Sequence, residues 1–113
     1  AIKEKSFSFA LEIVAIYKYL SFEKREFVLS KQILRSGTSI GANIREAEHA
    51  ESKADFIHKL SIALKEANET EYWLDLLYQS EYLTVSQFKN IKDQITQQLK
   101  LLTSIINTTK NKN

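Results

Sequence analysis

The sequence predicts an all-α protein folded as an antiparallel, up-down-up-down four-helix bundle. Three observations lead to this fold class. The 113 residues include no proline and only two glycines, so little of the chain is suited to loops. Four stretches carry apolar residues at steps of three and four, which is the spacing of one helix face. The connections between these stretches are short, and short turns place successive long helices antiparallel and side by side.

The first predicted helix spans about residues 5–20. Its core-facing stripe comprises Ala10, Ile13, Tyr17 and Leu20, with Phe9 and Ile16 beside it. A second group of apolar side chains lies outside this stripe, at Phe7, Leu11 and Val14. These residues would leave an exposed apolar patch on a single chain, so we expect a second contact, with another copy of the protein. A turn is expected at residues 21–23.

The second predicted helix spans about residues 23–49 and contains both glycines. Its apolar stripe comprises Phe27, Leu29, Ile33, Gly37, Ile40, Ile44 and Ala47. Gly37 and Gly41 each lower helix stability by about 1 kcal/mol relative to alanine, so this helix would be weak in isolation. We expect compensation by close packing against a neighbouring helix, through the small residues Ser36, Gly37, Ser39, Gly41 and Ala42.

A polar strip runs beside the apolar stripe of the second helix. Its members recur at helical spacing: Arg35, Ser36, Ser39, Asn43 and Glu46. One interpretation is a network that sets the register of the helices, in which Arg35 and Asn43 reach carboxylates of the third helix. Glu66 and Glu69 are candidates for those carboxylates. The other interpretation is a surface that binds phosphates of RNA or DNA through Lys24, Arg25, Lys31, Arg35 and Arg45.

The third predicted helix spans about residues 53–80. Ser52 and Asp55 have the spacing of a capping box, which predicts the start of the helix. The apolar stripe then follows an unbroken alternation of four and three residues, through Phe56, Leu60, Ala63, Ala67, Thr70, Leu74 and Leu77.

The fourth predicted helix spans about residues 85–108, after a second capping box at Thr84 and Gln87. Its stripe comprises Phe88, Ile91, Ile95, Leu99, Leu102 and Ile106, while Val85, Leu101 and Ile105 lie outside it. The helices together form one domain over residues 1–108. Residues 109–113 are polar and lack an apolar anchor, so we expect a frayed tail.

Charge is segregated along the chain, although the net charge is only +2. Residues 1–45 carry eight basic and four acidic side chains, residues 46–81 three and nine, and residues 82–113 five and one. Pairing between neighbouring helices is one explanation, because an antiparallel bundle brings these segments together. A phosphate-binding surface is the other, although a pI of 8.8 is modest for it.

Composition also bears on location. The chain has no cysteine, which fits a reducing compartment. Its first twenty residues mix lysine with glutamate and lack a signal-peptide pattern, and no uncharged run approaches the length of about 18 residues that a membrane span needs. We therefore expect a cytoplasmic protein without membrane contact.

Catalytic and metal motifs are poorly represented. Glu46 and His49 have the Glu-x-x-His spacing of di-metal bundles, and Asp55 and His58 nearly match it, but both pairs lie beside the turn between the second and third helices. No serine-nucleophile turn and no phosphate-binding glycine loop is present. Arg45 and His49 are too close in sequence for the Arg-x4-6-His ribonuclease motif. The sequence therefore predicts no metal, no cofactor and no catalytic residue, with a di-metal enzyme as a remote alternative.

Three segments together resemble a known family. They are QILRSGTSIGANIREA at residues 32–47, FALEIVAIYKYL before it, and ANETEYWLDLL after it. The chain resembles the bacterial four-helix bundle proteins encoded within intervening sequences of 23S ribosomal RNA genes. Related proteins include the accessory variability determinant of diversity-generating retroelements, which forms a five-fold barrel and engages nucleic acid and a reverse transcriptase. The resemblance therefore implies a homopentameric ring.

These observations predict a non-enzymatic, homo-oligomeric helical scaffold. The expected partners are further copies of the chain, RNA or DNA, and a nucleic-acid-processing protein. The alternative is a protein-binding adaptor without affinity for nucleic acid. Salt-dependent binding to arbitrary RNA or DNA would distinguish the two, because phosphate contacts weaken steeply as salt rises.

Overall fold

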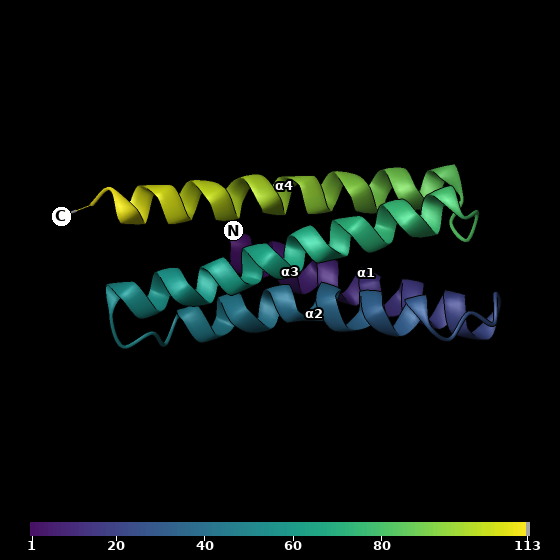
Figure 1. Cartoon of the computed structure of the whole chain (residues 1–113), viewed down its shortest axis with the longest axis horizontal. Helices are drawn as coiled ribbons and strands as arrows, with labels where there is room; N and C mark the ends of the chain where they lie inside the picture. The colour runs from purple at the N-terminus through teal and green to yellow at the C-terminus, as the bar shows by residue number, and fades with distance from the viewer. Residues whose placement is uncertain (113) are drawn as a thin grey trace.

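Four helices joined by three turns make up the computed structural model of the chain, which describes residues 1–112 (Figure 1). The helices are α1 (Ile2–Phe22), α2 (Leu29–Ala47), α3 (Lys53–Gln79) and α4 (Val85–Lys110). Residues 1–112 contain no strand, and they form a rod of 50 × 21 × 19 Å. The predicted all-α four-helix fold is therefore confirmed. No helix within these residues is both long enough and apolar enough to cross a membrane.

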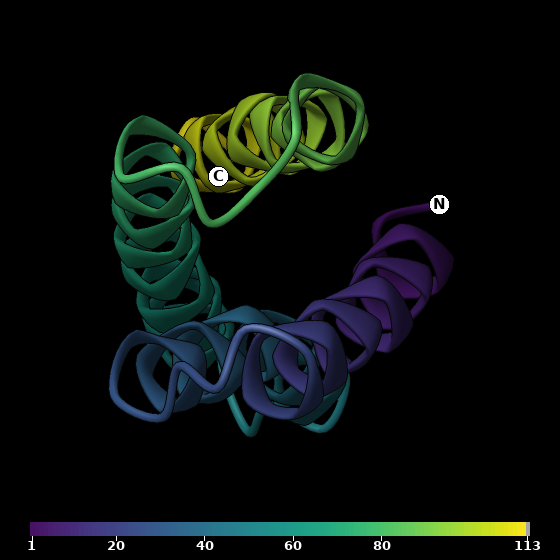
Figure 2. The same cartoon turned by 90° about the vertical axis from the view of Figure 1, so that its right-hand side faces the viewer.

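The helices follow one another around the long axis of the rod. Viewed along that axis, α1, α2, α3 and α4 form an incomplete ring that is open between α1 and α4 (Figure 2). The α2 and α3 helices contact each other most extensively, and α1 and α4 contact each other least. The bundle is thus a central α2–α3 pair with α1 attached to α2 and α4 attached to α3.

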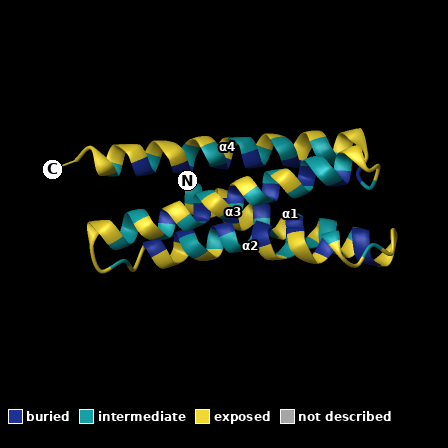
Figure 3. Ribbon diagram, viewed as in Figure 1, coloured by how far each residue is buried: buried dark blue, intermediate teal, exposed yellow. Residues whose placement is uncertain are grey.

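Each helix turns one apolar face toward a common core (Figure 3). Phe9, Ile13 and Leu20 of α1 are fully buried, whereas Ala10 and Tyr17, which were predicted on the same stripe, are only partly buried. On α4, Leu99 was predicted on the buried stripe but is only partly buried, and the neighbouring Gln98 is buried instead. The core is otherwise aliphatic, with Ile33, Ile40, Ile44, Leu60, Leu74, Leu77, Ile91, Ile95 and Leu102 among its members.

The α2 helix begins at Leu29, six residues after the predicted start. The carboxylate of Glu26 accepts hydrogen bonds from the backbone N–H groups of Val28, Leu29 and Ser30, at 3.1, 3.0 and 2.7 Å. Arg25, immediately before it, has a positive φ of 52°. The chain therefore turns at residues 23–28, and a glutamate supplies the acceptors that a serine or aspartate cap usually provides.

The other boundaries lie close to their predicted positions. Ser52 accepts a hydrogen bond from the Asp55 N–H at 3.0 Å, and Thr84 and Gln87 form the reciprocal capping box. The α1 helix begins at Ile2 and ends at Phe22, and α2 ends at Ala47 rather than at residue 49. The α4 helix continues to Lys110, so the first two residues of the predicted tail are helical. Residue 113, also assigned to that tail, lies outside the described residues.

Candidate functional site

The two glycines lie where α1 and α2 cross. A Cβ atom on Gly37 would lie 2.8 Å from both Cγ1 and Cγ2 of Ile13, which is too close for any side chain. At Gly41 the nearest atom is the Ser6 hydroxyl oxygen at 3.3 Å. The absence of a side chain at Gly37 lets the α1 side chain pack directly onto the α2 backbone, and this contact offsets the low helix propensity of glycine.

A buried hydrogen bond joins α2 to α3 beside Gly37. The hydroxyl oxygens of Ser36 and Thr70 are both fully buried and lie 2.9 Å apart. Thr70 Oγ1 also lies 2.8 Å from the backbone carbonyl oxygen of Glu66. Both hydroxyls are therefore paired, so their burial carries no unsatisfied polar group.

Arg35 links the same helices at the surface. Its guanidinium lies 3.1 Å from a carboxylate oxygen of Glu66 and also pairs with Glu69. Glu69 accepts a second hydrogen bond from Trp73 Nε1 at 3.0 Å. The Trp73 hydrogen bond and then Arg35 hold the pKa of Glu69 below its ordinary value, against the opposing effect of partial burial. The hydrogen bond to Glu69 raises the pKa of Arg35.

The rest of the polar strip bonds mostly within α2. Asn43 donates to the carbonyl oxygen of Ser39 at 2.8 Å and does not reach Glu66 or Glu69, contrary to the expectation from its spacing. The Ser39 hydroxyl donates to the carbonyl oxygen of Arg35 at 2.6 Å. Glu46 pairs with Lys59 of α3 at 3.0 Å. The strip therefore contributes two ion-pairing residues, Arg35 and Glu46, to the contact with α3.

The five cations proposed for phosphate binding do not form one cluster. Lys24 and Arg25 lie in the α1–α2 turn, while Lys31 and Arg45 are separated by about 21 Å along α2 at 1.5 Å per residue. Arg35 is neutralised by its two glutamates. Among residues 1–112, the other four form no ion pair. Three of these contact aromatic rings: Lys24 over Tyr19, Arg25 over Phe27 and Arg45 over Phe7, at 5.8 to 5.9 Å from the ring centres.

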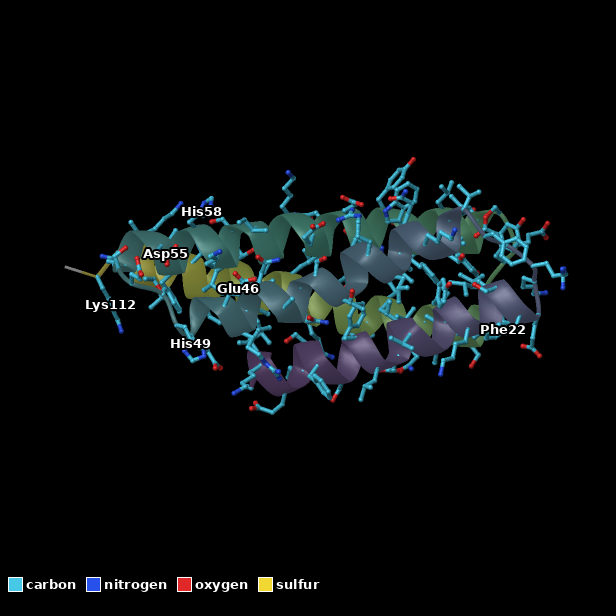
Figure 4. The ribbon with its side chains drawn as sticks, turned by 90° about the horizontal axis from the view of Figure 1, so that it is seen from below. Phe22, Glu46, His49, Asp55, His58 and Lys112 are labelled. Atoms are coloured by element: carbon cyan, nitrogen blue, oxygen red, sulfur yellow. The ribbon has the colours of Figure 1, made fainter. Side chains whose placement is uncertain are left out.

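One end of the rod, which we call the tip, gathers aromatic and basic groups. It is formed by the α1–α2 and α3–α4 turns, and Figure 4 shows Phe22 at this end, opposite His49 and Lys112. The side chain of Phe22 is 75% exposed. A hollow of about 670 Å³ at the same end of the rod is lined by Tyr19, Lys24, Tyr78 and Tyr82, among others. The sequence places Tyr78 beside the apolar stripe of the third helix and does not predict that Tyr78 and Tyr82 line a hollow; Tyr78 lies in the last turn of α3, and Tyr82 lies in the α3–α4 turn.

A second surface, which we call the α1–α2 face, is apolar and shallow. Phe7 and Leu11, one helical turn apart on α1, are 54% and 58% exposed. A hollow of about 370 Å³ beside Phe7 has small residues on its floor, including Ala10, Gly41 and Ala42. Arg45 lies at its edge, over the Phe7 ring. Of the apolar residues noted on α4, Val85 is exposed at the tip, whereas Leu101 and Ile105 are half-buried.

The residues that match the di-metal motif serve other purposes. Glu46 pairs with Lys59, and Asp55 accepts a hydrogen bond from the Glu51 N–H at 3.2 Å. The two histidines lie on different sides of the rod end (Figure 4). Within residues 1–112, no three histidine, cysteine, aspartate or glutamate side chains are grouped as metal ligands.

These features define a class of protein: an all-α bundle whose distinctive surface groups are exposed aromatic and cationic side chains. The chain belongs to the family of 23S rRNA-intervening sequence proteins, whose family model matches residues 1–104. The resemblance inferred from residues 32–47 and their flanking segments is therefore confirmed.

A solved structure supports the same assignment. A protein of unknown function from the S23 ribosomal protein family of Bacteroides thetaiotaomicron is 64% identical in sequence. The match covers 94% of this chain and 98% of that one, with a TM-score of 0.93. A search of curated proteins gives no match.

Proposed function

We propose that this protein is a non-enzymatic scaffold that assembles with copies of itself through the α1–α2 face and presents its tip to nucleic acid. The observation that carries the proposal is the exposure of Phe7 and Leu11 beside a hollow floored by small residues. The homopentameric ring implied by the family resemblance is the assembly that we expect.

The α1–α2 face suits contact with a second copy. Burial of apolar surface contributes about 25 cal/mol per Å², and large side chains such as Phe7 and Leu11 supply most of that surface. The hollow beside Phe7 admits a side chain from a partner because Gly41 and Ala42 leave it empty. A closed ring requires a head-to-tail contact, in which Phe7 and Leu11 of one copy insert into the hollow of the next copy.

The tip suits weak, repeated contact with nucleic acid. Lys24 and Arg25 are exposed and unpaired within residues 1–112, and each lies over an aromatic ring. Lysine and arginine neutralise phosphates, and exposed aromatic rings stack with bases. Two cations alone bind weakly, but a ring of copies repeats them at fixed spacing, so the assembled particle binds more tightly than one chain.

Light scattering tests the assembly. We expect the wild-type mass in solution to be a multiple of 13.1 kDa, and Leu11→Glu to shift it toward a single chain. Tyr72→Glu is the matched control, because Tyr72 is equally exposed but lies on α3. A wild-type protein with the mass of one chain would overturn the scaffold proposal.

Titration with a fluorescent single-stranded RNA of arbitrary sequence tests the tip. We expect binding that weakens steeply between about 50 and 200 mM salt and is reduced in the Lys24→Glu, Arg25→Glu double variant. Lys65→Glu is the control, since Lys65 lies in the acidic α3 segment. Absence of binding at low salt would favour the adaptor without nucleic-acid affinity.

A further inference from the structure

The side of the bundle between α1 and α4, which we call the seam, differs from the other three sides. The α1 and α4 helices contact each other least, and the ring of helices is open here (Figure 2). Two hollows lie one after the other along the seam. The first, of about 280 Å³, is lined by Glu4, Lys5, Ser8, Gln94, Gln97 and Gln98. The second, of about 170 Å³, is lined by Glu12, Ala15, Ile16, Gln87, Asn90 and Ile91.

Gln98 is the unusual residue in this seam. It is only 1% exposed, yet neither Nε2 nor Oε1 of its side chain has a hydrogen-bond partner among residues 1–112. Folded proteins pair nearly all buried polar groups, because an unpaired one is costly. A ligand that paired with Gln98 would offer both an acceptor and a donor, and Gln98 itself lines the first hollow.

Gln98 is one member of a row of carboxamides on α4. Asn90, Gln94 and Gln98 are each four residues apart, which spaces them by about 6 Å along the helix. An extended polypeptide presents its backbone N–H and C=O groups to the same side at every second residue, with a repeat of about 6.8 Å. A carboxamide carries a donor and an acceptor side by side, so it can pair with the N–H and the C=O of one residue of an extended chain. The row therefore approximates the repeat of an extended chain.

The charges of the seam disfavour a polyanion. The charged residues that line its two hollows are Glu4, Lys5 and Glu12, so carboxylates outnumber amines. Phosphate groups would be repelled here, whereas an uncharged peptide backbone would not. This argument separates the seam from the tip, where cations are exposed.

Weak polar contacts bridge the seam at present. Lys5 Nζ donates to Gln97 Oε1 at 3.2 Å, and Asn90 Nδ2 donates to Glu12 Oε1 at 3.0 Å, both at the exposed surface. Such exposed bonds exchange with water at little cost. The amide of Gln98 is covered, so a ligand reaches it when α1 moves slightly away from α4, and this movement breaks the least extensive helix contact of the bundle.

We propose that the seam between α1 and α4 binds an extended polypeptide segment through its backbone, with the carboxamide of Gln98 as the buried anchor. Asn90 and Gln94 continue the same pairing along α4. The occupant is a segment of a partner protein that is extended when bound and is recognised mainly by its peptide groups. The proposal depends neither on self-assembly nor on nucleic-acid binding.

Nuclear magnetic resonance tests the chemistry of the seam. Blocked trialanine, which offers only peptide groups and methyls, is titrated in the millimolar range into ¹⁵N-labelled protein. We expect saturable shifts of the side-chain amide signals of Asn90, Gln94 and Gln98. Adenosine monophosphate is the comparison probe. Shifts with the nucleotide alone, or with neither probe, would overturn the proposal.

A matched pair of variants then tests the anchor. A dodecapeptide selected from a display library for wild-type binding is titrated against Gln98→Met, which keeps the side-chain length but cannot hydrogen-bond in the same way. We expect affinity at least about tenfold lower. Gln32→Met, on the exposed surface of α2, should bind as wild type does. Equal binding by Gln98→Met and wild type would overturn the assignment of Gln98.

Discussion

Gly37 and Ile13 form a contact between α2 and α1 that leaves no room for a methyl group on the glycine. A Cβ atom on Gly37 would have the two Cγ atoms of Ile13 as its nearest neighbours, and Ile13 is itself fully buried. A β-branched side chain has little rotamer freedom to move aside. This contact explains why the bundle keeps a residue that disfavours helix at the centre of α2.

Gly37→Ala should therefore destabilise the protein, although alanine is the better helix former. Overpacking costs about 1 to 3 kcal/mol, and the gain in helix propensity is only about 1 kcal/mol. We expect a net loss of up to about 2 kcal/mol in the free energy of unfolding, measured by urea denaturation. In an Ile13→Ala background the same change should become neutral or stabilising. A loss of equal size in both backgrounds would disprove the contact.

Gly41 should tolerate alanine better than Gly37 does. Its Cβ would meet the Ser6 hydroxyl at 3.3 Å, which a small shift relieves. Gly41→Leu, in contrast, would fill the hollow on the α1–α2 face and overpack against α1. We expect a lower melting temperature or a smaller assembly for Gly41→Leu, and neither for Gly41→Ala. Thermal denaturation and light scattering measure these two outcomes.

Glu26 should act as the cap of α2. Glu26→Ala removes the acceptor of three backbone N–H groups, so we expect a loss of about 1 to 2 kcal/mol in unfolding free energy. Glu23→Ala is the control, because Glu23 is an exposed glutamate in the same turn. If both variants unfold at the same urea concentration, the cap contributes nothing.

Glu69 should make stability depend on pH. Its pKa in the folded protein is lowered, so its charged form is favoured by folding. The stabilisation is present above the ordinary carboxylate pKa of about 4.3 and is lost as pH falls through the lower folded value. Wild type should therefore lose more unfolding free energy than Glu69→Gln between about pH 5 and pH 3. Parallel curves for the two proteins would contradict this assignment.

Gln98→Met should raise stability. The unpaired amide of Gln98 is buried at a cost of about 1 to 3 kcal/mol, and a thioether of similar length avoids that cost. We expect a gain of about 1 to 2 kcal/mol in urea denaturation without peptide. Gln94→Met, at a partly buried position, should change stability little. A destabilised Gln98→Met would show that the amide has a partner.

The sequence was informative where spacing and local chemistry agree. The stripes of α2 and α3 and the caps at Ser52 and Thr84 follow from residue pattern, because each depends on neighbours three or four positions away. The start of α2 was missed because Glu26 caps from two residues before Val28, outside the usual serine or aspartate position. The burial of Gln98 was missed because the adjacent Leu99 is apolar and also fits the helical spacing, so Leu99 was assigned to the stripe.

The candidate site was predicted only in part. Arg35 reaches the two glutamates of α3 as its helical face suggested, since a long side chain spans the gap between neighbouring helices. Asn43 is too short to do so and bonds to its own helix. The hollow with Tyr78 and Tyr82 depends on how two turns meet in space, which residue spacing within one helix cannot reveal.

The unequal contacts between the helices also determine the order in which the helices unfold. Since α1 and α4 are each held chiefly by one neighbour, either outer helix can peel away while the α2–α3 hairpin stays intact. Backbone amides of α2 and α3 should then be the last to exchange with deuterated solvent. A detached outer helix of one chain fits equally well onto the α2–α3 hairpin of another chain. Two chains can therefore form a domain-swapped dimer by exchanging α1 or α4.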